Sequence, residues 1–161
     1  YAGLILDTQN FNRNTGVRTF GAAIFLDNAG GSLERGRELL KSEASEYKKL
    51  ASAQAGVTIY KSVYAITIYE DDDDANNRII AAKAADSLLE IEGVKATFVL
   101  TSVEGDIHIS ARSDGSINVS LILETIGGGG HFNMAGARLE NSTMENAVLE
   151  LKDAIEKYEK K

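Results

Sequence analysis

The sequence predicts an α/β protein in which a helical N-terminal part precedes a compact α/β domain, with a mixed sheet flanked by helices. Residues 1–56 carry apolar residues at helical spacing, separated by short polar stops. From about residue 57, segments typical of strands alternate with helical segments. We therefore expect two parts, residues 1–56 and 57–161, with the boundary near residues 55–60. A length of 161 residues suits one domain or two small ones.

The composition limits the class of protein. The formal net charge is −7. A long nucleic-acid groove needs clustered Lys and Arg, so this charge argues against one, although it leaves room for a small nucleotide in a local pocket. The chain has no cysteine, which excludes disulfides and thiolate zinc sites. No apolar run approaches the roughly 20 residues that span a bilayer, and no signal peptide is present.

Four short helices are expected in the N-terminal part. Apolar spacing predicts the first two, Ser32 with Glu34 and Arg35 opens the third, and the fourth is rich in Glu, Lys and Ala. The expected ranges are 2–6, 20–26, 32–40 and 42–55. The chain begins at Tyr1 rather than at methionine, and its first residues are already apolar. We therefore expect it to be an excised part of a longer protein.

Strands and helices alternate in the C-terminal part. In chain order we expect a strand over 63–69, a helix over 74–91, strands over 96–103 and 107–112, a helix over 119–126, a short strand over 135–139 and a final helix. Residues 104–106 and 114–116 predict turns because they combine Gly with acidic and small polar residues. The acidic run at 70–74 is expected to be a solvated stretch before a helix rather than a metal site.

Periodicity decides which faces of these elements are buried. Apolar residues share one face of the helix over 74–91, and Gly93 follows it as a stop. Ile107, Ile109 and Ala111 lie on one side of their strand, so His108 is expected to face solvent. Ser142 with Glu145 predicts a capping box for the last helix. The apolar stripe of that helix consists of Val148, Leu151, Ile155 and Tyr158.

The most distinctive motif is the glycine segment, which we define as Gly127, Gly128, Gly129, Gly130 and His131. One interpretation is a turn that joins a helix to a strand. A turn needs one or two glycines, however, and four in a row carry a high backbone-entropy cost. We therefore favour a loop whose backbone N–H groups hold a phosphate, with the histidine as a further donor. The segment lacks the Lys-Ser/Thr ending of a P-loop.

Three other positions are candidates of lower specificity. Arg112 with Ser113 ends a predicted strand, and a guanidinium suits phosphate geometry, although a surface arginine is equally compatible with this position. Asp7 follows an apolar run and is a helix cap, a salt-bridge partner or one ligand of a Mn²⁺ or Mg²⁺ site. Arg18 either reaches a substrate phosphate or, as we prefer, pairs with an acidic neighbour.

These motifs together resemble a known family. Residues 107–137 contain Ile-His-Ile-Ser-Ala-Arg-Ser, the four glycines with histidine, and Ala-Gly-Ala, and they resemble the DHHA1 domain of the DHH phosphoesterase superfamily. Residues 3–11, Gly-Leu-Ile-Leu-Asp-Thr-Gln-Asn-Phe, resemble the end of the DHH catalytic domain, and residues 15–20 resemble the segment after it. With Ala-Lys-Ala-Ala-Asp-Ser-Leu at 82–88, the order is most similar to cyclic-di-AMP phosphodiesterases of the GdpP/YybT type.

The resemblance implies a metal-dependent phosphodiesterase. The family uses a two-metal centre, usually manganese, to activate a water and stabilise both oxygens of an in-line displacement. Asp7 matches the last carboxylate ligand of that centre, whereas the Asp-His-His motif is expected upstream of Tyr1. The glycine segment matches the substrate grip, together with Arg112 and Ser113. We expect a parent that opens cyclic-di-AMP to linear pApA, and a fragment that is inactive alone.

Partners and location follow from the same resemblance. We expect a cytoplasmic domain, without membrane contact of its own, in a parent anchored in the cell membrane. The expected ligand is a cyclic dinucleotide or a short oligonucleotide, with no long nucleic acid, and a homodimer is left open. One alternative is a nanoRNA or oligonucleotide phosphodiesterase of the same superfamily. Another is a nucleic-acid-binding DHHA1 module, against which the net charge of −7 counts.

Overall fold

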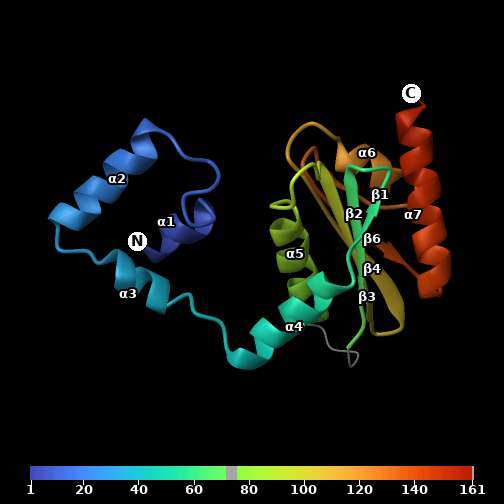
Figure 1. Cartoon of the computed structure of the whole chain (residues 1–161), viewed down its shortest axis with the longest axis horizontal. Coiled ribbons are helices and arrows are strands. Elements are labelled where there is room, and N and C mark those ends of the chain that lie inside the picture. Colours follow the sequence, from blue (N-terminus) through green and yellow to red (C-terminus); the bar gives the residue numbers. More distant parts are fainter. Residues whose placement is uncertain (72–75, 161) are drawn as a thin grey trace. The chain divides into compact units, whose positions relative to one another are not determined.

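A computed structural model describes residues 1–71 and 76–160 of the chain. The chain divides into two compact units, Tyr1–Ala44 and Ser45–Lys161. Figure 1 shows the helices of the first unit and the sheet of the second. Helix α4 (Ala44–Ala55) buries Ala53 in a cluster of the second unit. The domain boundary expected near residues 55–60 stays a prediction.

Three helices make up the first unit, as the sequence predicts. They are α1 (Ala2–Asp7), α2 (Val17–Asn28) and α3 (Leu33–Glu38). Ser32 caps α3 by accepting a hydrogen bond from the Arg35 backbone N–H at 3.2 Å. The Tyr1 hydroxyl donates to the Ala23 carbonyl oxygen at 2.7 Å and so ties α1 to α2. Helix α2 buries none of its residues, so its apolar side chains remain exposed.

The second unit is built on a six-stranded mixed sheet. The strand order is β1-β2-β3-β4-β6-β5, in which β2 and β3 are parallel and the other neighbours are antiparallel. The strands are β1 (Thr58–Tyr60), β2 (Tyr64–Tyr69), β3 (Ala96–Val103), β4 (Asp106–Ser113), β5 (Gly129–His131) and β6 (Met134–Leu139). Helix α5 (Asn77–Leu88) provides the crossover that a parallel β2–β3 pair requires.

Helices cover the two faces of the sheet unequally (Figure 1). Helices α6 (Val119–Glu124) and α7 (Met144–Glu159) close the main core on one face. Strand β4 turns Ile107, Ile109 and Ala111 toward this core, as predicted from their alternation. On the other face, α4 and α5 pack against β2 and β3 in a smaller cluster. Helix α5 also contacts β4, so the outer strands β6 and β5 extend beyond it.

The α/β class and the mixed sheet flanked by helices are confirmed, with local corrections. Strand β1 was not expected, because it has only three residues. The N-cap of α7 is Thr143, which accepts from the Asn146 N–H at 3.2 Å, rather than Ser142. Helix α5 is described from Asn77. Residues 72–75, which include most of the acidic run and the expected helix start, lie outside the described residues. The predicted turn at Glu104 and Gly105 has both residues at positive φ, which is typical of a tight hairpin.

The main core predicts a large contrast between two leucines of α7. Leu151 is 0% exposed, whereas Leu149 is 65% exposed on the opposite side of the helix. Leu151→Ala should lower the free energy of unfolding by about 2–5 kcal/mol, because it leaves a cavity in the core. Leu149→Ala, the matched control, should change it by less than about 0.5 kcal/mol. Chemical denaturation of both variants measures the difference, and equal destabilisation would contradict the packing described here.

Candidate functional site

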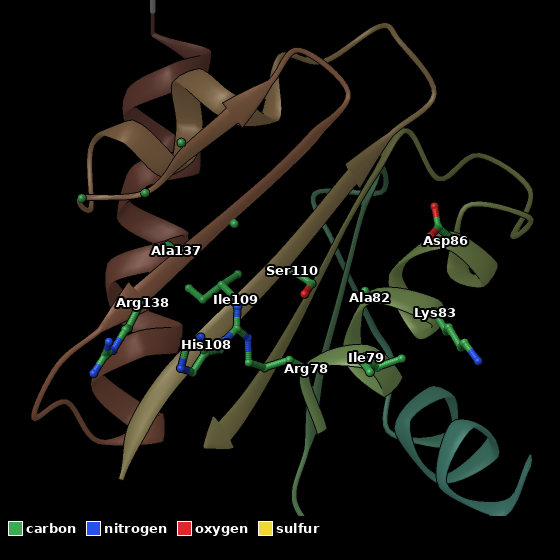
Figure 2. A pocket seen from close by; sticks show the side chains of 14 residues that line it. Arg78, Ile79, Ala82, Lys83, Asp86, His108, Ile109, Ser110, Ala137 and Arg138 are labelled. Atoms are coloured by element: carbon green, nitrogen blue, oxygen red, sulfur yellow. The ribbon is translucent and has the colours of Figure 1, made fainter. Parts of the chain in front are cut away.

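The half-covered face of the sheet carries a groove of about 950 Å³. Helix α5 forms one wall, β4 and β6 form the floor, and the first three glycines of the glycine segment form the other wall (Figure 2). The polar side chains that line the groove are Arg78, Lys83, Asp86, His108, Ser110 and Arg138. A volume of this size is at the upper end of the range for small-molecule sites.

The glycine segment is partly a helix end rather than an open loop. Gly127 has φ +82°, its N–H donates to the Glu124 carbonyl at 3.3 Å, and the Gly128 N–H donates to the Leu123 carbonyl at 2.8 Å. These two bonds form a Schellman motif that ends α6. The N–H groups of Gly127 and Gly128 therefore serve the helix end and are engaged within the fold.

Gly128 and the strand that follows it, β5, lie unusually close to β6. A Cβ at Gly128 would come within 2.5 Å of the Gly136 carbonyl oxygen, and one at Gly130 within 2.5 Å of the Met134 carbonyl oxygen. The close approach that the four glycines predict is thus, at two of them, an approach to the protein's own strand. Gly129 differs, because a Cβ there would meet nothing within 4 Å and its φ is not left-handed. Gly129 lines the groove.

His131 ends β5 opposite Met134 and is exposed. The tip of this hairpin is fixed to the rest of the domain through two carbonyls. The Ser113 N–H donates to the Asn133 carbonyl at 3.0 Å, and the Val119 N–H donates to the Phe132 carbonyl at 2.9 Å. His131 therefore projects from an anchored hairpin whose strand β5 begins beside the groove.

Arg112 and Ser113 lie on opposite faces of β4. The Arg112 Nε donates to Asp86 Oδ1 on α5 at 3.0 Å, and its Nη1 donates to the Ala111 carbonyl at 3.0 Å. The Arg112 side chain is 11% exposed, so this ion pair is well shielded from solvent. Ser113 is 2% exposed, pairs with Ala96 and accepts from the Gly115 N–H at 3.4 Å. The structure does not bring Ser113 to the groove.

His108 points away from the main core, as its alternation predicts, but it lines the groove and is not fully exposed to solvent. It is half-buried and sits opposite Arg138 on β6, and Figure 2 shows the Arg78 side chain reaching from α5 toward it. Burial and the nearby charges of Arg78 and Arg138 lower the pKa of His108, against a smaller opposite effect of Asp106. The imidazole is therefore mainly neutral at neutral pH. The outward side of β4 faces α5, whose N-terminal turn carries Arg78.

The sequence analysis missed Arg78 and Ser110. Ser110 lies between His108 and Arg112 on the same side of β4, next to Gly136 on β6, which in turn pairs with Gly129. The sequence does carry a signal for this face of β4, because polar side chains occupy every second position of the predicted strand. No comparable signal marks Arg78, because its place beside His108 depends on how α5 packs on the sheet.

The first unit holds the other two candidates. Asp7 ends α1 with an exposed side chain, and its backbone carbonyl accepts from Asn14 Nδ2 at 3.4 Å. Arg18 is exposed in the first turn of α2. Among residues 1–71 and 76–160, no group of three or more His, Asp or Glu side chains has the spacing of a metal site. The described residues thus do not by themselves fit a two-metal centre. In the same part of the chain, no helix is long and apolar enough to cross a membrane.

Comparison with known proteins places this arrangement in a family. Residues 57–161 match the DHHA1 domain model. The chain is 38% identical over 158 residues to the cyclic-di-AMP phosphodiesterase PdeA of Listeria monocytogenes, covering 98% of this chain and 24% of that protein. It is 37% identical over 159 residues to the cyclic-di-AMP phosphodiesterase GdpP of Bacillus subtilis, with the same coverage. The chain thus spans about a quarter of the length of these curated relatives.

A solved structure agrees with the fold. The crystal structure of an exopolyphosphatase-related protein from Bacteroides fragilis matches with a TM-score of 0.81 and 22% identity, over 96% of this chain and 48% of that one. The resemblance to the DHH phosphoesterase superfamily is confirmed. The chain belongs to the DHH/DHHA1 family, and the DHHA1 domain model matches its residues 57–161.

Proposed function

We propose that this chain is the substrate-gripping part of a phosphodiesterase that hydrolyses cyclic-di-AMP to linear pApA, and that its groove holds the nucleotide. The observation that carries this proposal is the charge of the groove. The whole chain has a net charge of −7, yet, among the described residues, the cationic side chains of Arg78, Lys83 and Arg138 line the groove beside His108, and Asp86 is the carboxylate that lines it. Local clustering of cations in an acidic protein favours a small anionic ligand over a long nucleic acid.

The residues in and beside the groove have different roles in the proposed binding of the nucleotide. Gly129 leaves its wall free of side chain, and Ser110 beside Gly136 makes a floor of small residues on which a flat base or a sugar can lie. His131 at the hairpin end supplies a donor for a phosphate oxygen. Arg112 holds α5 to the sheet through Asp86, so its first role is to position the groove wall, and it reaches a phosphate only by exchanging Asp86 for it.

In this proposal, the metal centre needs ligands that are not among the residues described by the structure. Asp7 would donate one carboxylate to a manganese site, and Arg18 would lie near the substrate phosphate in the same parent. One carboxylate cannot hold two metal ions, so no chemical step is assigned to residues of this chain. The proposal places the domain in the cytoplasm, within a parent anchored in the cell membrane.

Binding without turnover is the first expected behaviour. The purified chain with cyclic-di-AMP and Mn²⁺ should bind the dinucleotide but release no pApA, because the described residues assemble no metal site. Calorimetry measures the binding, and liquid chromatography of the same mixture measures the product. Release of pApA above a protein-free control would contradict the proposal that this chain binds the substrate without cleaving it. Preferential binding of a short linear oligonucleotide would favour the nanoRNA phosphodiesterase instead.

Gly128 and Gly129 provide a matched pair of substitutions. Gly128→Ala should lower the free energy of unfolding by about 1–3 kcal/mol, because the new Cβ would overlap β6. Gly129→Ala should keep or slightly raise it, since the Cβ meets nothing and the unfolded chain loses freedom. It should nevertheless weaken cyclic-di-AMP binding, because the methyl group enters the groove. Denaturation and calorimetry separate the two effects. Unchanged affinity in Gly129→Ala would mean that the ligand lies elsewhere.

A further inference from the structure

The end of the groove beside the N-terminal turn of α5 carries three polar side chains without partners. They are Arg78 on α5 and His108 and Ser110 on β4. Within the part of the chain that the structure describes, none of the three makes a hydrogen bond or an ion pair through its side chain. Lys83, another cation of the groove, is already paired with Glu46, and Arg112, which follows Ser110 on the same side of β4, is paired with Asp86. These three groups are therefore available to a ligand.

Arg138 completes the electrostatic surroundings of this cluster. It lies opposite His108 on β6, and its guanidinium is held by Asp106 at 2.8 Å and 2.6 Å. That ion pair holds Arg138 beside the imidazole and offsets part of its charge. The free positive charge at this end of the groove is thus the guanidinium of Arg78, whose fork suits the oxygens of a phosphoryl group.

The cluster is separate from the glycine segment. Ser110, Gly136 and Gly129 form one cross-strand row, and His108 with Arg138 forms the next row on the same side of the sheet. Two residues along a strand correspond to about 7 Å. His131 lies one row beyond Gly129 in the opposite direction, level with Met134 and Arg112. Small residues of the groove floor thus separate the donors inside it, His108 and Ser110, from His131, which lies just beyond the other end.

We propose that Arg78, His108 and Ser110 form a second anion subsite, which takes the terminal phosphomonoester of a linear dinucleotide. The inference rests on the proposed function, in which the end near the glycine segment holds the internal phosphodiester. A terminal phosphate carries about two negative charges at neutral pH, whereas a diester carries one. A free guanidinium, an imidazole and a hydroxyl at one end consequently favour the linear product over the cyclic substrate.

The two histidines of the chain make this proposal testable, since His108 lines the groove and His131 lies one cross-strand row beyond Gly129 at its opposite end. His108 and His131 are the full histidine complement of the sequence. Their imidazole signals can be followed by NMR in the intact 161-residue chain and assigned with His108→Gln and His131→Gln. The ligands are pApA, ApA without the terminal phosphate, and inorganic phosphate. The subsite predicts that pApA shifts both signals, ApA shifts His131 alone, and inorganic phosphate shifts His108 first.

The failures of the two proposals are distinguishable in this titration. If pApA shifts His131 and leaves His108 unchanged, the second subsite is wrong while the proposed function stands. If pApA shifts neither signal, the groove does not bind the nucleotide and both proposals fall. If ApA moves His108 as strongly as pApA does, the cluster does not recognise the terminal phosphate, and the inference is overturned.

Substitution of Arg78 tests the same subsite through affinity. Arg78→Gln, at an exposed helix position, should weaken pApA binding about tenfold, as expected for loss of a charge-assisted hydrogen bond. It should leave ApA binding unchanged. Lys95→Gln removes an equal charge from an exposed position at the opposite end of the sheet and is the matched control. Equal losses in the two variants would show a general charge effect and contradict a subsite.

The protonation of His108 provides a readout that does not depend on affinity. In the free chain its pKa lies below the usual value, because burial and the charges of Arg78 and Arg138 oppose protonation, whereas Asp106 and Glu104 favour it. A bound phosphate dianion adds negative charge, so saturation with inorganic phosphate should raise the pKa, and Arg78→Gln should raise it in the free chain. NMR titration with pH measures both shifts. An unchanged pKa in saturating phosphate would contradict the subsite.

Discussion

The site exists because the sheet is wider than the helices that cover one of its faces. Six strands at about 4.8 Å spacing span about 24 Å, whereas a helix with its side chains is about 10 Å across. Helices α6 and α7 bury the apolar residues of β4 and β6 on one face. On the other face, α4 and α5 pack together over β2 and β3, joined by a hydrogen bond from Gln54 to Ser87 at 2.7 Å. Helix α5 reaches as far as β4, so the strip that remains uncovered begins at β4 and includes β6 and β5, and β4 and β6 form the floor of the groove.

In this strip of the sheet, the side chains on one face of each strand are exposed to solvent and those on the other face are buried in the core. Strand β6 meets this requirement by alternation, since Ala135, Ala137 and Leu139 are buried while Met134, Gly136 and Arg138 are exposed. The glycines at 128 and 130 then let β5 approach β6 closely enough to extend the sheet by one strand. The wall of the groove is thus an edge strand, and its main-chain atoms are accessible at Gly129 because no side chain covers them.

Most of the architecture could be predicted from periodicity. Strands β2, β3, β4 and β6 and the helices α5, α6 and α7 follow apolar spacing, which reflects burial on one face and is visible in a single sequence. The elements that were not expected are three-residue strands, too short to show an apolar spacing of their own. Strand β1 is defined only by pairing with β2, and β5 only by pairing with β6. The glycine segment was recognised as a place of close approach, but the approaching backbone, β6, is specified by the tertiary fold.

Tertiary contacts also determine which arginine can bind an anion. Motif reasoning singles out Arg112, yet its guanidinium is shielded from solvent and bonded to Asp86. A phosphate that bound Arg112 would have to displace a carboxylate already desolvated with it, and breaking such a buried pair costs several kcal/mol. Among the residues that the structure describes, Arg78 has no such competitor, and it lies on the solvent side of the same helix. On electrostatic grounds, the Arg112–Asp86 pair holds α5 against β4, and the exposed guanidinium beside His108 is the one that is free to meet an incoming anion.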